Sequence, residues 1–212
     1  MARSFSALIA NLSTALARPL PAAAAHALMA PTPRRVWPDG VHQARDAAAL
    51  VLLFPRGGRA YIVLTVRAET LGRHGGQVSL PGGVIEPGEA FAEAALREAY
   101  EEIALPRDGV RIVGALTAID IPVSGFRLHP IVGASDIRPS LAPADGEVAR
   151  ILEVPIEDLM AHGSVITTER ERDGRRVAVP AFRIGADEIW GATAMVLAEF
   201  LAVLGWRGPR AR

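Results

Sequence analysis

Three glutamates near the middle of the chain are spaced so that they share one face of a helix. Glu98, Glu101 and Glu102 stand at i, i+3 and i+4 within an uninterrupted run of good helix formers, Ala90 to Ile103. Like charges at this spacing destabilise a helix by a few tenths of a kcal/mol per pair unless something compensates them. Two interpretations follow: a solvated acidic face, or a site for Mg²⁺ or Mn²⁺, hard cations that bind carboxylate oxygens.

The residues around these glutamates complete a longer pattern with fixed spacing. A glycine is followed by five unconstrained positions and a glutamate, and seven more positions lead to an Arg-Glu pair. At ordinary residue frequencies, six such positions arise by chance on the order of once in ten million starts. The pattern resembles the Nudix box, the signature of the Nudix hydrolase superfamily, and is carried by Gly83, Glu89, Arg97, Glu98, Glu101 and Glu102.

The resemblance implies a divalent-metal site and assigns a role to each acidic residue. Glu98 and Glu102 would be the principal ligands of Mg²⁺ or Mn²⁺, with Glu101 contributing directly or through water. The carbonyl of Gly82 would complete the site. A bound divalent cation neutralises the charge of a pyrophosphate and lowers the pKa of a bound water, so that a nearby carboxylate can take the proton.

The remaining positions of the box would support this site. Gly83 opens the box, Glu89 would support the acidic cluster from just before the helix, and Arg97 would orient a carboxylate by a charge-assisted hydrogen bond. Ala104 departs from the family, which usually has glycine there, at the end of the helix. Alanine in the left-handed conformation of that glycine would cost roughly 1 kcal/mol. We expect this change to affect the geometry of the following loop more than the carboxylates.

A second resemblance precedes and follows the box and points to the coenzyme A pyrophosphatase subfamily. The upstream residues follow the form LLTxR, L, HxGQVAFPGG, with Ser79 and Leu80 in place of the usual Ala and Phe. The downstream residues are similar to the subfamily in three short segments. The matching positions are Leu64–Arg67, Leu71, His74, Gly76–Val78, Leu80–Gly83, Gly125–Arg127, Pro130–Gly133 and Ile189–Ala194.

This resemblance implies hydrolysis of the diphosphate linkage of coenzyme A or acyl-coenzyme A, giving 3′,5′-ADP and a 4′-phosphopantetheine. The partner would be a small, nucleoside-diphosphate-linked molecule, and because the family is commonly dimeric, a homodimer is a further expectation. Two alternatives stay open. One is a Nudix pyrophosphatase acting on ADP-ribose, a dinucleotide or a nucleoside triphosphate. The other is a Nudix module that binds a nucleotide without turnover.

Residues outside the box are candidates for holding phosphate and for moving a proton. The chain has no lysine, so any phosphate that the metal does not hold must be bound by arginine; Arg67 and Arg73 flank the glycine-rich approach to the box. The alternative interpretation of both is surface solubility. Several Nudix families carry the catalytic base on a loop near the site, and Glu147, just before a strand, fits that position; Glu98 is the alternative.

The composition of the chain excludes several other classes of function and of chemical site. The 23 basic and 23 acidic residues cancel, so no overall charge attracts nucleic acid or an anionic membrane. All 23 basic residues are arginine and there is no cysteine, which rules out lysine Schiff bases, thiol nucleophiles, disulfides and zinc–thiolate sites. The most apolar long stretch, Ile189 to Leu204, is interrupted by Glu199 and is too short to cross a bilayer comfortably.

The order of elements predicts a mixed α/β sandwich, and the resemblance implies a Nudix-type α/β/α sandwich with a mixed β-sheet, here with an N-terminal helical extension. Apolar runs of strand length precede and follow the central helix, and a final helix is expected from Asp187 to Leu204. We expect residues 1–36 to form an Ala- and Arg-rich extension and linker, and residues 37–212 to form the hydrolase domain.

The extension itself has two interpretations. Its arginines, its lack of acidic residues and its many alanines overlap with the composition of organellar transit peptides. The alternative, which we favour, is an amphipathic helix that packs on its own domain or on a partner subunit, with the protein in the cytoplasm. Its apolar face would be formed by Phe5, Leu8, Ile9, Leu12 and Leu16.

Overall fold

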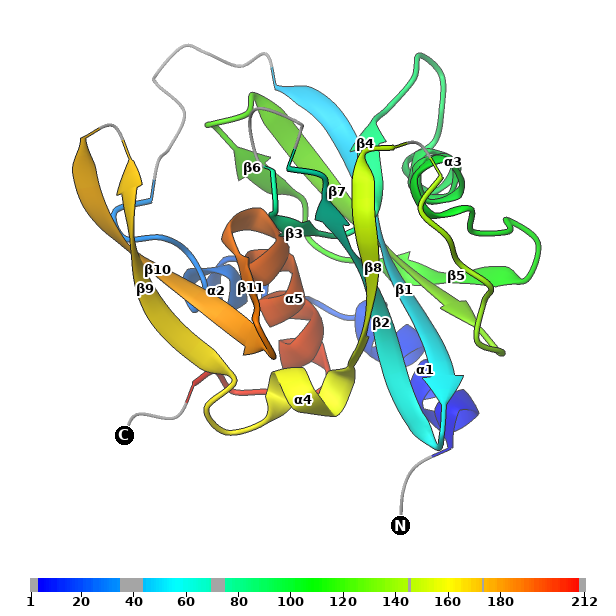
Figure 1. Ribbon diagram of the computed structural model, residues 1–212. Helices are drawn as coiled ribbons and strands as arrows, with labels where there is room; N and C mark the ends of the chain where they lie inside the picture. Colours follow the sequence, from blue (N-terminus) through cyan, green and yellow to red (C-terminus); the bar gives the residue numbers. More distant parts are fainter. Residues whose placement is uncertain (1–3, 35–43, 70–74, 145, 173, 210–212) are drawn as a thin grey trace.

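The fold is built around a mixed β-sheet (Figure 1). The structure is a computed structural model, and it describes residues 4–34, 44–69, 75–144, 146–172 and 174–209. The central strand β1 (Arg45–Arg56) pairs antiparallel with β2 (Arg59–Arg67) and β4 (Gly82–Val84), and parallel with β7 (Phe126–Ser135). The sheet is completed by β3 (Val78–Ser79) and β8 (Val148–Pro155) on β2, and by β5 (Val110–Ala115) and β6 (Ile119–Ile121) on β7.

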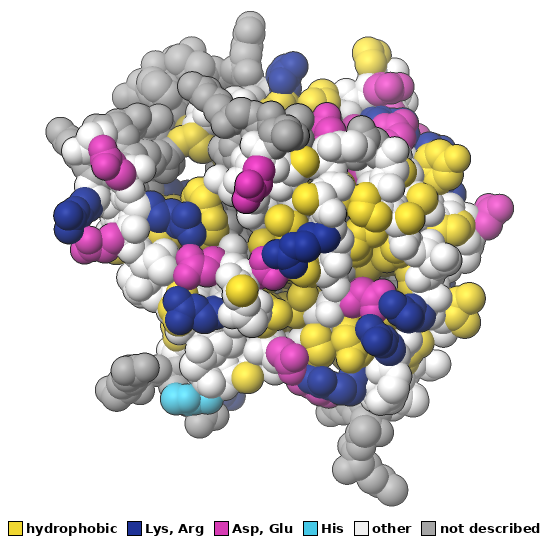
Figure 2. All heavy atoms as spheres, in the orientation of Figure 1, with side chains coloured by type: hydrophobic (Ala, Val, Ile, Leu, Met, Phe, Trp, Pro, Cys, Tyr) yellow, Lys and Arg dark blue, Asp and Glu magenta, His cyan; other side chains and the backbone are white. Residues whose placement is uncertain are grey.

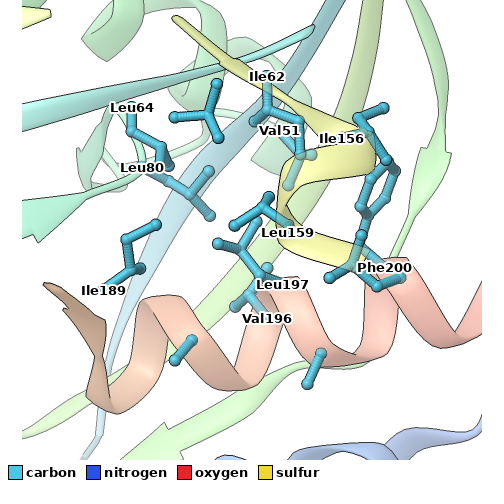
Figure 3. Close-up of a cluster of buried hydrophobic side chains, with 14 of the residues drawn as sticks. Val51, Ile62, Leu64, Leu80, Ile156, Leu159, Ile189, Val196, Leu197 and Phe200 are labelled. Carbon is cyan, nitrogen blue, oxygen red and sulfur yellow. The ribbon is translucent and has the colours of Figure 1, made fainter. Parts of the chain in front are cut away.

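Strand β1 is buried on both faces, which explains its continuous apolar run. Alternate residues of a strand point to opposite faces. Leu50, Leu52 and their neighbours at even positions pack against α3 (Phe91–Ile103), while Val51 and Leu53 belong to the cluster that includes α5 (Gly191–Val203). Figure 3 shows the cluster on the α5 side of the sheet, in which Leu159 is drawn between Val51 of β1 and Leu197 of α5. The two helices therefore cover the two faces, and the expected α/β/α sandwich is confirmed.

A three-stranded sheet contains the last part of the chain before α5. It consists of β9 (Val165–Arg172), β10 (Arg175–Ile184) and β11 (Asp187–Trp190), and α4 (Ile156–Met160) lies between the two sheets in sequence. The expectation that the final helix starts at Asp187 is wrong, because the helix starts at Gly191. Residues 187–190 pair with β10 instead, and this pairing places Ile189 opposite Phe182, both fully buried. Burial of these two apolar side chains against each other favours a strand over a helix for residues 187–190.

Two helices precede β1 and pack on the same molecule. In α1 (Phe5–Leu16) the predicted apolar face is confirmed, with Ile9 and Leu12 buried and the N-terminus capped by Ser4 Oγ, which accepts from the Ala7 N–H. The short helix α2 (Ala22–Ala27) was not predicted. The expected boundary at residue 36 lies outside the described residues. Within the part of the chain that the structure describes, no helix is long and apolar enough to span a bilayer.

Candidate active site

Two glycines of β4 allow the carboxylates of α3 to reach the sheet. A Cβ atom at Gly83 would lie 2.4 Å from the carboxylate of Glu98, so any side chain there would displace it. At Gly82 the chain runs so close to β1 that a Cβ would lie 2.3 Å from the Ala48 carbonyl oxygen. The Gly82 N–H donates to Glu102 Oε2 at 3.3 Å. Glu98 and Glu102, the two predicted principal ligands, therefore both face the Gly82–Gly83 backbone.

Arg97 holds the acidic residues of the box together. Its Nε and Nη2 atoms donate to the two carboxylate oxygens of Glu89, at 2.9 and 3.0 Å, in a bidentate pair. Nη1 donates to Glu98 at 2.9 Å and to Glu101 at 3.1 Å, and Nη2 also donates to the Val84 carbonyl oxygen at 2.9 Å. The guanidinium thus compensates the like charges on α3 and fixes the position of three carboxylates.

The carboxyl groups of the box differ in pKa because their surroundings differ. Burial raises the pKa of Glu98, and the hydrogen bond from Arg97 only partly offsets this effect. The pKa of Glu89 is lowered, chiefly by the hydrogen bonds from Arg97. Glu102 is only 6% exposed. Glu98 and Glu102 are thus both largely removed from water, and a nearby positive charge would favour the ionised form of Glu98.

A loop before β8 brings Glu147 and Arg67 together beside the end of α3. The Ala144 N–H donates to the Glu102 carbonyl oxygen at 3.1 Å, which holds this loop against the helix. Three residues on, Glu147 Oε2 accepts from Arg67 Nη2 at 2.8 Å, and the Glu147 carbonyl accepts from the Ala68 N–H. Two of the candidates outside the box are therefore neighbours. Arg73, like Leu71 and His74 of the upstream motif, lies outside the described residues.

Comparison with known proteins matches this arrangement to one family. A family model described as the NUDIX domain matches residues 44–177. The chain belongs to the Nudix family. It is 35% identical over 158 residues to an uncharacterized Nudix hydrolase, NudL, of Pectobacterium atrosepticum, covering 74% of this chain and 81% of that protein. It is also 35% identical to NudL of Cronobacter sakazakii, over 76% and 83% of the two chains.

Solved structures agree with the Nudix fold. The crystal structure of the Nudix hydrolase RenU from M. smegmatis has a TM-score of 0.55 at 19% identity, over 80% of this chain and 91% of that one. A MutT/nudix family protein from Enterococcus faecalis gives a TM-score of 0.53 at 17% identity, over 81% and 66% of the two chains. At these low sequence identities, the similarity to solved structures shows the fold alone. The family membership and the fold confirm the prediction of a Nudix hydrolase, that is, a pyrophosphohydrolase enzyme.

The donor set of the Nudix box fits a hard divalent cation. Among the described residues, no three acidic or histidine side chains converge as they stand, because Arg97 holds Glu98 and Glu101 while Glu102 turns toward the Gly82 N–H. Glu98 and Glu102 nevertheless present carboxylate oxygens to the same stretch of backbone, and no thiol is available in the chain to favour a soft metal. Glu98 and Glu102 would hold the cation, which would compete with Arg97 for Glu98.

Arg97→Lys tests the Arg97 clamp, the set of hydrogen bonds by which this arginine holds Glu89, Glu98 and Glu101. Lysine keeps the positive charge but cannot form the bidentate pair with Glu89 while also reaching Glu98. We expect kcat/KM for any diphosphate substrate to fall by about 10- to 100-fold, the usual effect of removing a residue that orients a ligand. Steady-state kinetics at saturating Mg²⁺ would measure this. Arg111→Lys, at an exposed ion pair with Asp136, is the matched control and should leave kcat/KM unchanged. Equal activity of both variants would contradict the proposed role of Arg97.

The end of the Nudix helix keeps the backbone that the family's usual glycine would adopt. Ala104 lies in the left-handed region at φ 52° and ψ 33°, and its N–H donates to the Tyr100 carbonyl oxygen at 2.9 Å. The Leu105 N–H then donates to the Ala99 carbonyl oxygen at 3.3 Å. The loop geometry is therefore preserved, and the alanine is strained.

Ala104→Gly should stabilise the fold by about 1 kcal/mol, because glycine adopts a positive φ without the crowding of a Cβ atom. Activity should stay the same or rise slightly, since the substitution leaves the box carboxylates and Arg97 unchanged and glycine can keep the hydrogen bond from the N–H of residue 104 to the Tyr100 carbonyl oxygen. Urea unfolding followed by circular dichroism measures the change in the free energy of unfolding. Ala99→Gly, buried in the interior of the same helix, should have the opposite sign. Destabilisation by Ala104→Gly would mean that the alanine methyl makes a packing contribution larger than its strain.

A cleft of about 890 Å³, here called the inter-sheet cleft, lies between the main sheet and the β9–β11 sheet. It is lined by the ends of β2 and β3, the β6–β7 turn, β9, β10 and the junction of β11 with α5. Arg67, at the end of β2, lines it and connects it to Glu147. On the face shown in Figure 2, acidic and basic side chains are interspersed with apolar ones.

Sequence reasoning missed a stacked pair in this cleft. The Arg170 guanidinium carbon lies 4.3 Å from the centroid of the Trp190 ring, and both residues line the cleft. Trp190 belongs to a segment recognised by resemblance, but no spacing rule connects it with an arginine on β9. The pairing of β9 and β11 with β10 brings the two side chains together.

Proposed function

We propose that this Nudix hydrolase uses Mg²⁺ or Mn²⁺ to hydrolyse the diphosphate linkage of coenzyme A or acyl-coenzyme A, with 3′,5′-ADP and a 4′-phosphopantetheine as products. The observation that carries diphosphate hydrolysis is the approach of the Glu98 and Glu102 carboxylates to the Gly82–Gly83 backbone under the Arg97 clamp. The choice of coenzyme A rests on the likeness of Leu64–Gly83 and Ile189–Ala194 to the coenzyme A pyrophosphatase subfamily.

The site divides the work between the cation ligands and the surrounding residues. When bound, a divalent cation neutralises the diphosphate and lowers the pKa of an attacking water. Arg97 keeps Glu98 in place, and Glu147, on the loop that contacts the end of α3, is our candidate for taking the proton of the water. Arg67 holds Glu147 in position at 2.8 Å and lines the cleft through which a substrate would extend. Water adds across one P–O bond of the diphosphate, so each product keeps one of its two phosphates: the 5′-phosphate of 3′,5′-ADP and the 4′-phosphate of phosphopantetheine.

A substrate panel tests the proposal. Coenzyme A, acetyl-coenzyme A, dephospho-coenzyme A, ADP-ribose, NADH and a nucleoside triphosphate would each be incubated at mildly alkaline pH with Mg²⁺ or Mn²⁺. Products would be resolved by mass. We expect metal-dependent cleavage of coenzyme A to 3′,5′-ADP, with a higher kcat/KM than for dephospho-coenzyme A.

Each other outcome has a defined meaning. Cleavage of ADP-ribose without coenzyme A would keep the hydrolase and reject the subfamily assignment. Absence of cleavage in protein that binds Mn²⁺, measured by titration calorimetry, would reject turnover and favour a nucleotide-binding module. Cleavage in the presence of EDTA would contradict the metal-dependent mechanism.

A further inference from the structure

The stacked pair of Arg170 and Trp190 is unusual because fold stability alone does not account for it. Arg170 Nε is buried and has no hydrogen-bond partner among the described residues. Buried donors in proteins are almost always paired, so an unpaired one calls for a reason. Arg170 Nη2 donates to Glu188 Oε2 at 2.9 Å, and Arg183 donates to the other carboxylate oxygen of Glu188 at 3.2 Å. Glu188 therefore does not depend on Arg170 for a partner.

The charges of the inter-sheet cleft favour an uncharged ligand group at this place. Several charged residues of its lining are already ion-paired: Arg67 with Glu147, Asp120 with Arg127, and Glu169 with Arg176. Arg170 is itself compensated by Glu188. Of the arginines in the lining, Arg67 and Arg170 are therefore already engaged, while Arg34 adds an exposed cation. The part of the cleft around Trp190 thus suits a neutral part of the substrate.

The surface of the pair favours a planar ring over an aliphatic chain. A guanidinium stacked on an aromatic ring presents a flat, polarised face, and the Arg170 side chain keeps 34% of its surface exposed at the cleft. A heteroaromatic ring can stack on this face through cation–π and π interactions. An aliphatic chain would remove water from the guanidinium without offering any interaction in return. Apolar side chains, among them Ile121, Val179 and Met195, line the cleft around the pair.

The cleft lies within reach of the carboxylate site. Ser79 lines the cleft and Gly82 faces Glu102, and these two residues are three positions apart. Three residues span at most about 10 Å. The Ser79 edge of the cleft therefore lies within the span of a nucleoside 5′-phosphate from the carboxylate site. Strand β3, which carries Ser79, lies against β11, which carries Trp190, so a base in the cleft and its phosphate at the carboxylate site can belong to one substrate.

We infer that Arg170 and Trp190 form a shelf that binds the nucleobase of the substrate by stacking. This inference rests on the proposed function for the position of the phosphate. It assigns the inter-sheet cleft to the nucleoside half of the substrate and leaves the other half of the diphosphate outside this cleft.

Binding of adenosine 5′-monophosphate tests the shelf without any need for turnover, because this compound has no diphosphate. Titration calorimetry with Mg²⁺ would compare it with ribose 5-phosphate, which lacks the base. We expect the wild-type protein to bind the nucleotide at least about tenfold more tightly. Trp190→Leu and Arg170→Gln should each weaken nucleotide binding about tenfold, within the range of base stacking on protein side chains, and leave ribose 5-phosphate unaffected.

Two matched variants separate stacking from structural effects. Trp190→Phe keeps an aromatic face and should retain most of the affinity. Arg183→Gln removes the second partner of Glu188 but lies outside the stack, so it should bind like the wild type. Circular dichroism and thermal unfolding check that each variant is folded.

The inference falls if the wild type binds ribose 5-phosphate as tightly as the nucleotide, or binds neither at millimolar concentration. It also falls if folded Trp190→Leu and Arg170→Gln stay within twofold of the wild type. If the nucleotide results are as expected and coenzyme A is not cleaved, the shelf stands and the proposed function fails. If coenzyme A is cleaved and neither Trp190→Leu nor Arg170→Gln changes the affinity for the nucleotide, the proposed function stands and the shelf is rejected.

Discussion

Glu98→Gln should reduce kcat for diphosphate hydrolysis on the order of 10²- to 10³-fold, the scale expected when one preorganised electrostatic group is removed from an active site. The amide keeps the shape of the side chain and an oxygen that can accept from Arg97 Nη1, now at 2.9 Å from Glu98. It loses the negative charge that a divalent cation needs. Glu102→Gln should behave in the same way, because its amide can still accept from the Gly82 N–H.

Stability should move in the opposite direction from activity. Burial raises the pKa of Glu98, which means that the fold holds this carboxylate in its charged form at a cost. A neutral amide removes that cost and the repulsion from Glu101, so the free energy of unfolding should stay the same or rise slightly. Loss of activity together with unchanged or higher stability would separate a metal ligand from a merely structural residue.

Glu93→Gln is the matched control on the same helix. Glu93 Oε2 accepts from the Ala90 N–H at 2.9 Å, a contact that the amide oxygen can replace, and it lies outside the carboxylate cluster. Its activity should equal that of the wild type. Phosphate-coupled product detection at several Mg²⁺ concentrations would measure all three variants. Wild-type turnover in purified Glu98→Gln would reject the assignment of Glu98 as a ligand.

Glu199→Ala should lower the free energy of unfolding by about 3–5 kcal/mol, the usual effect of breaking a buried, hydrogen-bonded charge network. Glu199 on α5 is completely buried. Its carboxylate accepts from the Ala22 N–H at 3.0 Å, from the His26 ring at 3.1 Å, and from the backbone and side chain of Thr117 at 3.0 and 2.6 Å. Alanine would leave all these donors without a partner and detach α2 from α5.

Glu157→Ala and Glu199→Gln calibrate this effect. Glu157 pairs with Arg59 on the surface with 65% of its side chain exposed, so its loss should cost no more than about 1 kcal/mol. Glu199→Gln keeps one acceptor oxygen and should fall between the two alanine variants. Urea unfolding followed by circular dichroism measures all three. A loss for Glu199→Ala as small as that for Glu157→Ala would show that the network contributes little.

The same network predicts a pH dependence. Burial acts to raise the pKa of Glu199, but the hydrogen bonds from His26 and Thr117 outweigh it, so the pKa in the folded protein lies below the ordinary value. A carboxyl group with a depressed pKa stabilises the fold above its unfolded pKa of about 4.3, and this contribution is lost as the pH falls through the folded pKa. The stability difference between wild type and Glu199→Gln should therefore be constant above about pH 5 and shrink toward pH 3. A difference that grows on acidification would contradict the sign.

The sequence by itself determined the elements whose residues are close along the chain. The spacing of the Nudix box placed Glu98, Glu101 and Glu102 on one face of α3, because a helical turn brings residues three and four apart together. The continuous apolar run that became β1 indicated a strand. The amphipathic face of α1 followed from the same periodicity, and the departure at Ala104 identified the strained end of the Nudix helix.

Only the tertiary structure decided which distant residues meet. Asp187–Trp190 reads as the start of a helix, but pairing with β10 makes it a strand. Glu199, which merely interrupts an apolar run in the sequence, accepts from residues up to 177 positions away. Arg67 meets Glu147 across 80 positions, and Arg170 meets Trp190 because two strands pair with a third. Periodicity reports which face of an element is apolar, whereas the partner of each face is set by how the sheets and helices pack to bury it, and that is a property of the whole chain.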